Sequence, residues 1–312
     1  MVTPETTVPG PEGTAPGAVP TAPVPRGRRR TRAASGAAST QGQDKATGWD
    51  NGRASGESLA VEVPGGPVLK GFLARPSFSA ASGAGRHGVV LAHGYPEAGE
   101  NAGTPSYGYP QLAARLAAET GAMVLTFEFR GTGTSEGDFS IGGWREDLVA
   151  AVQALRMSTS VERVWLVGFG MGGSLAVCVA ADDLSIAGVA LFAAPASFED
   201  YIGDPRRFLA QARAAGVIRT PGYPADPAAW AREAREVRPS QLVARVPPRP
   251  LLIVHGATDE VVPMTEAREM ADVAHTSAEL RVLPGASHRI LHDPRAIALL
   301  LGWFDRHLAT VA

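Results

Sequence analysis

Apolar positions divide the chain at about residue 57. Residues 1–56 consist mainly of proline, glycine, alanine, threonine and serine, and they show no periodic apolar pattern. A segment of this kind buries too little apolar surface to offset the conformational entropy that is lost on ordering. We therefore expect a disordered tail over residues 1–56 and one folded domain over residues 57–312.

Short apolar runs alternate with segments of helical pattern through most of the expected domain. Two alternating segments around Gly65-Gly66 predict a β-hairpin. The later runs are continuously apolar, which is typical of an α/β fold with a mostly parallel sheet and helices on both faces. The predicted strands cover residues 58–64, 67–76, 89–92, 122–129, 163–167, 186–193, 250–254 and 279–283. The predicted helices cover residues 109–120, 144–157, 265–275 and 294–308, and one more begins near residue 171.

The alternation is interrupted between residues 197 and 249. This segment contains several prolines and one short predicted helix over residues 228–236. Open α/β sheets bind ligands outside the carboxyl ends of their strands. We interpret residues 197–249 as a cap inserted over that edge, with a pocket beneath it.

Composition narrows the range of partners and compartments. The net charge of −2 gives no electrostatic argument for a nucleic-acid or membrane partner, and the basic run at residues 26–32 is typical of a solvated tail. No apolar stretch approaches the roughly 20 residues of a membrane-spanning helix. Cys178 is the only cysteine, which permits no intrachain disulfide and fits a reducing compartment. We expect a cytoplasmic protein, and the composition leaves its oligomeric state open.

The most informative segment is residues 164–173, VWLVGFGMGG. An apolar strand enters a tight turn and a helix follows, with glycines on both sides of the turn. In a nucleophile elbow, Gly-x-Ser-x-Gly, small flanking residues let strand and helix approach closely while the central side chain projects from the apex. Gly168 and Gly172 match the flanking glycines, and Gly170 stands where the serine is expected.

This segment resembles the nucleophile elbow of the α/β-hydrolase superfamily, particularly its small-capped serine esterases, lipases and aminopeptidase-like members. The resemblance extends from about Ser58 to the C-terminus. Residues 93–96, HGYP, resemble the family's oxyanion loop. The resemblance implies an oxyanion hole formed by the backbone N–H groups of Tyr95 and Met171. Residues 129–135, FRGTGTS, resemble a glycine-supported turn to which we assign a structural role.

Two later loops resemble those that carry the other members of the family's triad. Residues 255–263 place Asp259 in the acid position, and residues 284–288 place His288 in the position of the base. The order of acid and then histidine after the elbow is that of the superfamily. The resemblance therefore implies a histidine–aspartate dyad beside the apex.

Other candidates match these patterns less well. Glu199 and Asp200 follow a strand after which some family members carry the acid, but Asp259 matches its motif better. Residues 168–173 also match the dinucleotide pattern Gly-x-Gly-x-x-Gly, which normally lies in the first βα unit with an acidic residue about 20 positions further on. Here several strands precede the glycine pattern, and Asp182 follows it at a spacing shorter than about 20 residues. Because no metal-ligand cluster is visible either, we expect no metal and no organic cofactor.

Glycine at the apex excludes ordinary acyl-serine catalysis, because it has no side-chain atom that can attack a carbonyl. Three interpretations stay open. In the first, His288 oriented by Asp259 activates water or removes a substrate proton. Ser174 is the candidate for a substitute nucleophile, but it lies one helical turn beyond the apex and should point elsewhere. In the second, the protein binds a small acyl-type molecule under the cap without catalysis. In the third, a serine at position 170 has been replaced, and the parent hydrolyses an ester, thioester or amide.

Overall fold

The computed structural model describes residues 55–76, 86–96, 108–199, 202–275 and 278–308. All of them belong to one unit, Lys45–Ala312. The tail expected over residues 1–56 lies outside the described residues except for Ser55 and Gly56, and Asp200 also lies outside them.

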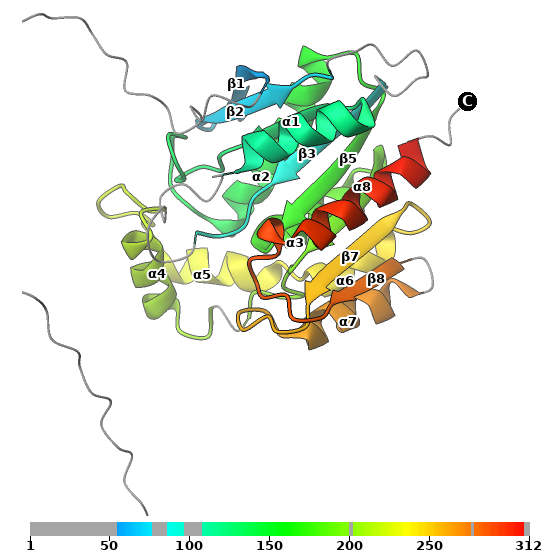
Figure 1. The fold of residues 1–312 in the computed structure, drawn as a ribbon. Helices are drawn as coiled ribbons and strands as arrows, with labels where there is room; N and C mark the ends of the chain where they lie inside the picture. Colours follow the sequence, from blue (N-terminus) through cyan, green and yellow to red (C-terminus); the bar gives the residue numbers. More distant parts are fainter. Residues whose placement is uncertain (1–54, 77–85, 97–107, 200–201, 276–277, 309–312) are drawn as a thin grey trace, which may run out of the picture. The chain divides into compact units, whose positions relative to one another are not determined.

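An eight-stranded sheet forms the centre of the described part (Figure 1). The spatial order of its strands is β1-β2-β4-β3-β5-β6-β7-β8. β1 pairs with β2 and β2 with β4 in antiparallel fashion, whereas all later neighbours pair in parallel. The predicted hairpin and the mostly parallel sheet are therefore confirmed. The strands are β1 (Glu57–Glu62), β2 (Val68–Ala74), β3 (His87–Ala92), β4 (Met123–Phe127), β5 (Arg163–Phe169), β6 (Ile186–Phe192), β7 (Leu251–Gly256) and β8 (Ala278–Leu283).

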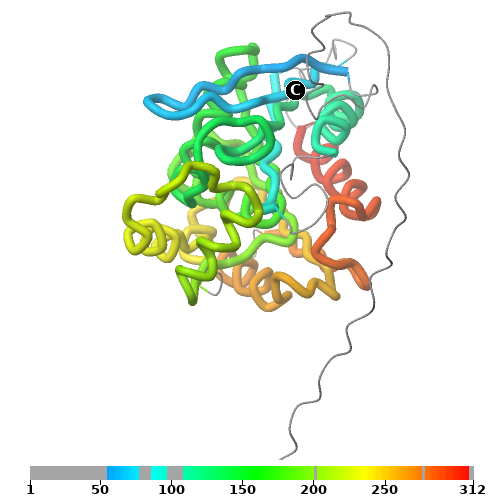
Figure 2. Tube along the Cα trace, turned by 90° about the vertical axis from the view of Figure 1, so that its left-hand side faces the viewer, coloured from blue at the N-terminus to red at the C-terminus, as the bar shows by residue number. Residues whose placement is uncertain are grey.

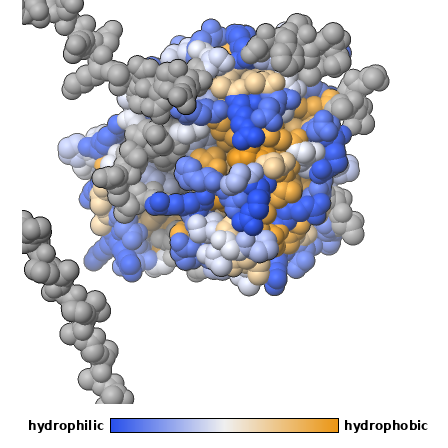
Figure 3. Space-filling view, in the orientation of Figure 1, coloured by the Kyte–Doolittle hydropathy of each residue, from blue (hydrophilic) through white to orange (hydrophobic). Residues whose placement is uncertain are grey.

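Helices cover both faces of this sheet. On one face, α1 (Tyr109–Thr120) and α8 (Pro294–Leu308) bury their apolar residues against the strands. α2 (Ile141–Ser158), α3 (Met171–Asp182) and α7 (Met264–Val273) pack on the other. The hydropathy view from the side of Figure 1 shows apolar residues in the middle of the face among hydrophilic ones (Figure 3). Burial of two apolar clusters, one on each side of the sheet, is what the continuously apolar strands predicted.

One helix begins earlier than the sequence predicts. α2 starts at Ile141, not near Trp144, and Ser140 caps it by accepting a hydrogen bond from Gly143 N–H at 2.9 Å. Two glycines in its first turn are poor helix formers. Because they interrupt the apolar periodicity, that pattern does not predict the true start of the helix. The serine cap supplies the stabilisation that the glycines do not.

The segment between β6 and β7 contains more helix than predicted. The expected short helix corresponds to α5 (Pro227–Glu236), but α4 (Pro205–Ala214) was not predicted. An aspartate immediately before each helix caps it by accepting main-chain N–H bonds, and the following proline occupies the first helical turn. Proline there starts a helix, because its missing N–H would be unpaired anyway. The short helices α6 (Pro239–Leu242) and η3 (Val243–Arg245) complete the segment.

α4 and α5 lie beyond the carboxyl ends of β3 and β5 (Figure 1), and Figure 2 shows them side by side. The rings of Phe208 in α4 and Trp230 in α5 are stacked with their centroids 5.2 Å apart. Trp230 Nε1 also donates a hydrogen bond to Phe139 O at 3.0 Å. The hydrogen bond joins the segment to the loop that precedes α2.

Candidate active site

Gly170 occupies the sharp turn between β5 and α3. Its φ of 50° and ψ of −126° lie in a region that residues with side chains rarely adopt. Its N–H donates to Phe192 O in β6 at 2.8 Å, and its carbonyl accepts from Gly173 N–H at 3.0 Å. The backbone of the apex is therefore held from the sheet and from the helix.

The two flanking glycines allow a close approach of neighbouring backbone. A Cβ at Gly168 would lie 2.4 Å from Gly172 O, and a Cβ at Gly172 would lie 2.4 Å from His93 O. Position 170 differs, because the nearest atoms to a Cβ there are Gly94 Cα at 3.6 Å and His288 Nε2 at 3.8 Å. These are ordinary van der Waals distances. Of the three glycines, only the one at the apex has room for a side chain.

Asp259 and His288 lie together at this apex. His288 Nδ1 is 2.9 Å from Asp259 Oδ2 and 3.2 Å from Oδ1. The Asp259 side chain is fully buried, whereas 20% of the His288 side chain is exposed. Because the carboxylate binds Nδ1, the other imidazole nitrogen is the one that faces Gly170. This arrangement suits proton transfer to or from a group bound at the apex.

Several N–H groups hold Asp259 in its ionised form. Val261 and Val262 donate their main-chain N–H groups to Oδ1 at 2.9 and 2.8 Å. Burial on its own would raise the pKa of Asp259, but the hydrogen bonds from His288, Val262 and Val261 lower it below the ordinary value. A second histidine, His255, places Nε2 3.5 Å from Asp259 Oδ2, a contact that no sequence motif predicted.

The 93–96 loop lies against the apex. A Cβ at Gly94 would be 3.2 Å from Phe169 O and 3.8 Å from Gly170 Cα. Tyr95 follows Gly94 in this loop, and Met171 follows Gly170 and begins α3. Their roles as oxyanion donors stay predictions.

The buried side chain of His93 holds the 93–96 loop in place. His93 is fully buried; its Nδ1 donates to Gly94 O at 2.7 Å, and its Nε2 accepts from Phe129 N–H at 3.1 Å. With one nitrogen donating and the other accepting, the imidazole is neutral. His93 therefore ties the loop to the end of β4 and has no nitrogen left for chemistry.

We expect His93 to make the fold sensitive to acid. Burial lowers the pKa of His93 from 6.5 to about 4, although its hydrogen bond to Gly94 acts in the opposite direction. The unfolded chain then takes up this proton at a higher pH than the folded one, so stability is fully present above pH 6.5 and declines toward pH 4. Between pH 7 and 4.5 the loss in free energy of unfolding should be about 2 to 3 kcal/mol.

Urea unfolding at pH 7 and pH 4.5 measures this loss. His93→Gln is the matched variant, because an amide oxygen can still accept from Phe129 N–H but does not titrate. We expect a smaller loss in the variant, and an equal loss in both proteins would contradict the assignment to His93.

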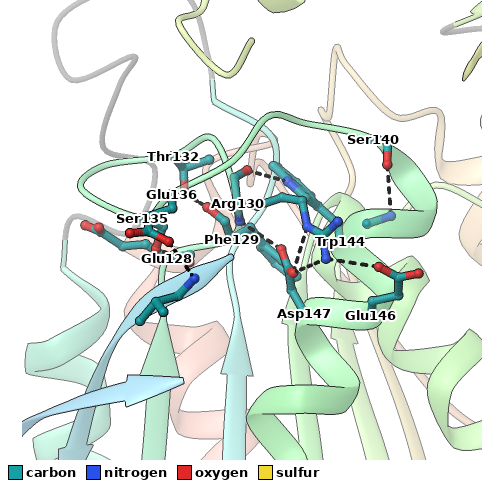
Figure 4. A network of polar contacts seen from close by, with 12 residues as sticks. Glu128, Phe129, Arg130, Thr132, Ser135, Glu136, Ser140, Trp144, Glu146 and Asp147 are labelled. Atoms are coloured by element: carbon teal, nitrogen blue, oxygen red, sulfur yellow. Dashed lines mark hydrogen bonds and ion pairs between the residues drawn. The ribbon is translucent and has the colours of Figure 1, made fainter. Parts of the chain in front are cut away.

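The turn at residues 129–135 forms a polar network beside the loop (Figure 4). Arg130 donates from its main-chain N–H and from Nε to the two carboxylate oxygens of the buried Asp147, each at 2.8 Å. Ser135 Oγ donates to Glu128 O at 2.6 Å. These groups hold neighbouring backbone in place, in agreement with the structural role assigned to the turn.

The alternative candidates point elsewhere. Ser174 is fully buried and its Oγ donates to Pro195 O at 2.5 Å, so its hydroxyl is directed away from the apex. Glu199 forms an ion pair with Arg238 at 2.6 Å. Within the described ranges, no group of three or more His, Cys, Asp or Glu side chains could hold a metal ion. In the same part of the chain, none of the helices combines the length and apolar character needed to cross a membrane.

Comparison with known proteins places the chain in a family. A model described as "Alpha/beta hydrolase family" matches residues 89–298. The uncharacterized protein YfhR of Escherichia coli O157:H7 is 27% identical over 238 residues, which cover 75% of this chain and 74% of that protein. The α/β hydrolase GrgF from Penicillium sp. sh18 has a TM-score of 0.62 at 18% identity, covering 81% of this chain and 99% of its own. An α/β serine hydrolase homologue from Coxiella burnetii has a TM-score of 0.54 at 24% identity, with 81% and 97% covered. The match over residues 89–298 shows that the chain belongs to the alpha/beta hydrolase family.

Proposed function

We propose that this protein hydrolyses acyl compounds, of the ester, thioester or amide class, without forming a covalent acyl intermediate. His288 acts as the general base on a water molecule, and Asp259 orients it. The observation that carries the proposal is the placement of the dyad. His288 Nδ1 lies 2.9 Å from Asp259 Oδ2, and His288 Nε2 faces the apex at Gly170. An acid–base pair is thus assembled where the elbow has no nucleophile.

The proposed reaction is a direct attack of water on the bound carbonyl. His288 Nε2 takes the proton of the attacking water, and Asp259 stabilises the imidazolium that forms. The N–H groups of Tyr95 and Met171 donate to the developing oxyanion. The tetrahedral intermediate then collapses: the bond between the carbonyl carbon and the leaving group breaks, and the His288 imidazolium gives its proton to that leaving group. General acid–base catalysis contributes about 10² to 10⁴ in rate, so turnover should be slow beside that of a serine enzyme.

The segment at residues 197–249 is proposed as the cap over this site. The Tyr95 ring lies 6.1 Å, centroid to centroid, from Phe208 in α4 and 5.2 Å from Phe139. The inserted segment therefore packs against the same loop that is proposed to bind the oxyanion. An acyl chain bound at the apex would extend toward these aromatic side chains.

Non-catalytic binding of an acyl compound is a second candidate. Gly170 itself favours it, because the residue removes the usual attacking atom while the dyad and the loop stay in place. This function predicts stabilisation by acyl ligands without turnover. The two candidates share one site and differ only in whether His288 transfers a proton.

Hydrolysis of a p-nitrophenyl ester series by the protein and by His288→Ala tests the proposal. We expect slow hydrolysis in the unaltered protein and at least a tenfold loss in the variant, since the base contributes 10² or more. His292→Ala is the control, because this exposed histidine lies outside the dyad and should leave the rate unchanged. Equal rates with and without His288 would contradict the proposal, and a thermal shift with acyl compounds would then favour the binding function.

A further inference from the structure

We propose that His255 is a positioning residue for the dyad: its Nε2–H fixes the carboxylate of Asp259 and the loop that carries it. The proposal rests on the proposed function only in treating Asp259 and His288 as the working pair. It assigns a specific task to a histidine that the resemblance to known hydrolases left without a role in this chain.

The geometry determines which nitrogen of His255 carries the hydrogen. His255 is the penultimate residue of β7 and is fully buried. Its Nε2 lies 2.9 Å from Val262 O and 3.5 Å from Asp259 Oδ2. A carbonyl oxygen can only accept, so Nε2 must be the donor. This Nε2–H group lies 3.5 Å from the same carboxylate oxygen that His288 Nδ1 approaches to 2.9 Å.

The other nitrogen of His255 argues against a role in packing alone. Nδ1 is buried and has no hydrogen-bond partner in the part of the chain that the structure describes. Leaving a buried acceptor unpaired is destabilising, and an apolar side chain of similar size would avoid this penalty. The benefit of a histidine here must therefore come from the contacts of Nε2.

Those contacts constrain Asp259 in two ways. Val262 accepts from His255 through its carbonyl and donates to Asp259 Oδ1 through its N–H at 2.8 Å. His255 thus anchors a residue that itself holds the carboxylate. Directly, its Nε2–H also stabilises the negative charge at Oδ2. The carboxylate is then held in an orientation in which it accepts from His288 Nδ1.

The signature to follow is the proton between His288 Nδ1 and Asp259, observed by proton NMR without substrate. The informative pair of variants is His255→Gln and His255→Asn. A glutamine amide nitrogen can reach the position of Nε2, whereas the asparagine amide, shorter by one methylene, reaches only that of Nδ1. We expect the resonance to persist in His255→Gln and to exchange with water at least ten times faster in His255→Asn. His255→Leu, which keeps the packing and removes both nitrogens, should behave like His255→Asn.

Equal exchange rates in the glutamine and asparagine variants would overturn the proposal, as would an unchanged resonance in His255→Leu. If the leucine variant does not fold, the glutamine and asparagine pair decides alone. The measurement requires no turnover. A protein that lacks esterase activity but shows the expected difference would therefore disprove the proposed function and leave the role of His255 standing.

Discussion

Replacing Gly170 by serine is expected to raise the hydrolysis of p-nitrophenyl esters by about 10³-fold or more, because removing a triad nucleophile elsewhere costs up to about 10⁶. The position has room, since the nearest atoms to a Cβ lie at 3.6 and 3.8 Å. A serine Oγ one bond beyond that Cβ can come within hydrogen-bonding distance of His288 Nε2. Initial rates measure the gain, and an initial burst of p-nitrophenol would show that an acyl-enzyme accumulates.

Two further variants isolate the hydroxyl as the cause. Gly170→Ala introduces the same Cβ without an oxygen and should not raise the rate above that of the unaltered protein. The double variant Gly170→Ser with His288→Ala should lose most of the gain, because a serine hydroxyl is a weak nucleophile without its base. A serine variant no faster than the alanine variant would show that the dyad and loop do not form a working acyl-transfer site.

The result also bears on the three interpretations of the glycine. If only the serine form turns over, the site is intact and the protein with Gly170 is a binder or has lost its activity. If the glycine form also turns over, and His288→Ala abolishes this, general-base hydrolysis is supported. A large gain in the serine form is compatible with both outcomes, so the unaltered protein must be assayed beside it.

The strands and the site loops were predicted from different kinds of sequence information. Continuous apolar runs predict buried parallel strands because both of their faces must be covered, and the eight predicted strands all appear in the structure. α4 was missed because its Asp204-Pro205 start resembles a break in the pattern, although it is a cap followed by a first-turn proline. Local capping chemistry decides such boundaries, and apolar periodicity does not report it.

The resemblance of two loops to those of the hydrolase family predicted that Asp259 and His288 lie together, but two features of the site were not predicted by any motif. Three glycines of the elbow look alike in sequence, yet only at Gly170 would a Cβ meet its neighbours at ordinary van der Waals distances. The contact between His255 and Asp259 depends on how the loop after β7 folds back so that Val262 O meets Nε2. Both features arise from tertiary packing, which a single sequence does not reveal.

Gly172→Ala is expected to lower the free energy of unfolding by about 3 kcal/mol or more, through overpacking against rigid backbone. Its Cβ would lie 2.4 Å from His93 O and 2.6 Å from Ala92 O, so the end of β3 or the start of α3 must shift. Gly170→Ala is the matched control, because the same methyl group finds room there and costs only backbone strain of about 1 to 3 kcal/mol. Urea unfolding followed by circular dichroism measures both.

The comparison of these two variants separates helix propensity from steric exclusion. Gly172 lies in the first turn of α3, where alanine would be favoured over glycine by up to about 1 kcal/mol if space allowed. A net loss at position 172 therefore means that the contact with the 92–93 backbone outweighs propensity. A Gly172→Ala variant as stable as the parent would mean instead that the 92–93 backbone moves to make room for the methyl group at little cost in free energy. The loop carrying Tyr95 would then be too compliant to act as a preorganised oxyanion site, because such sites depend on donors that do not move during the reaction.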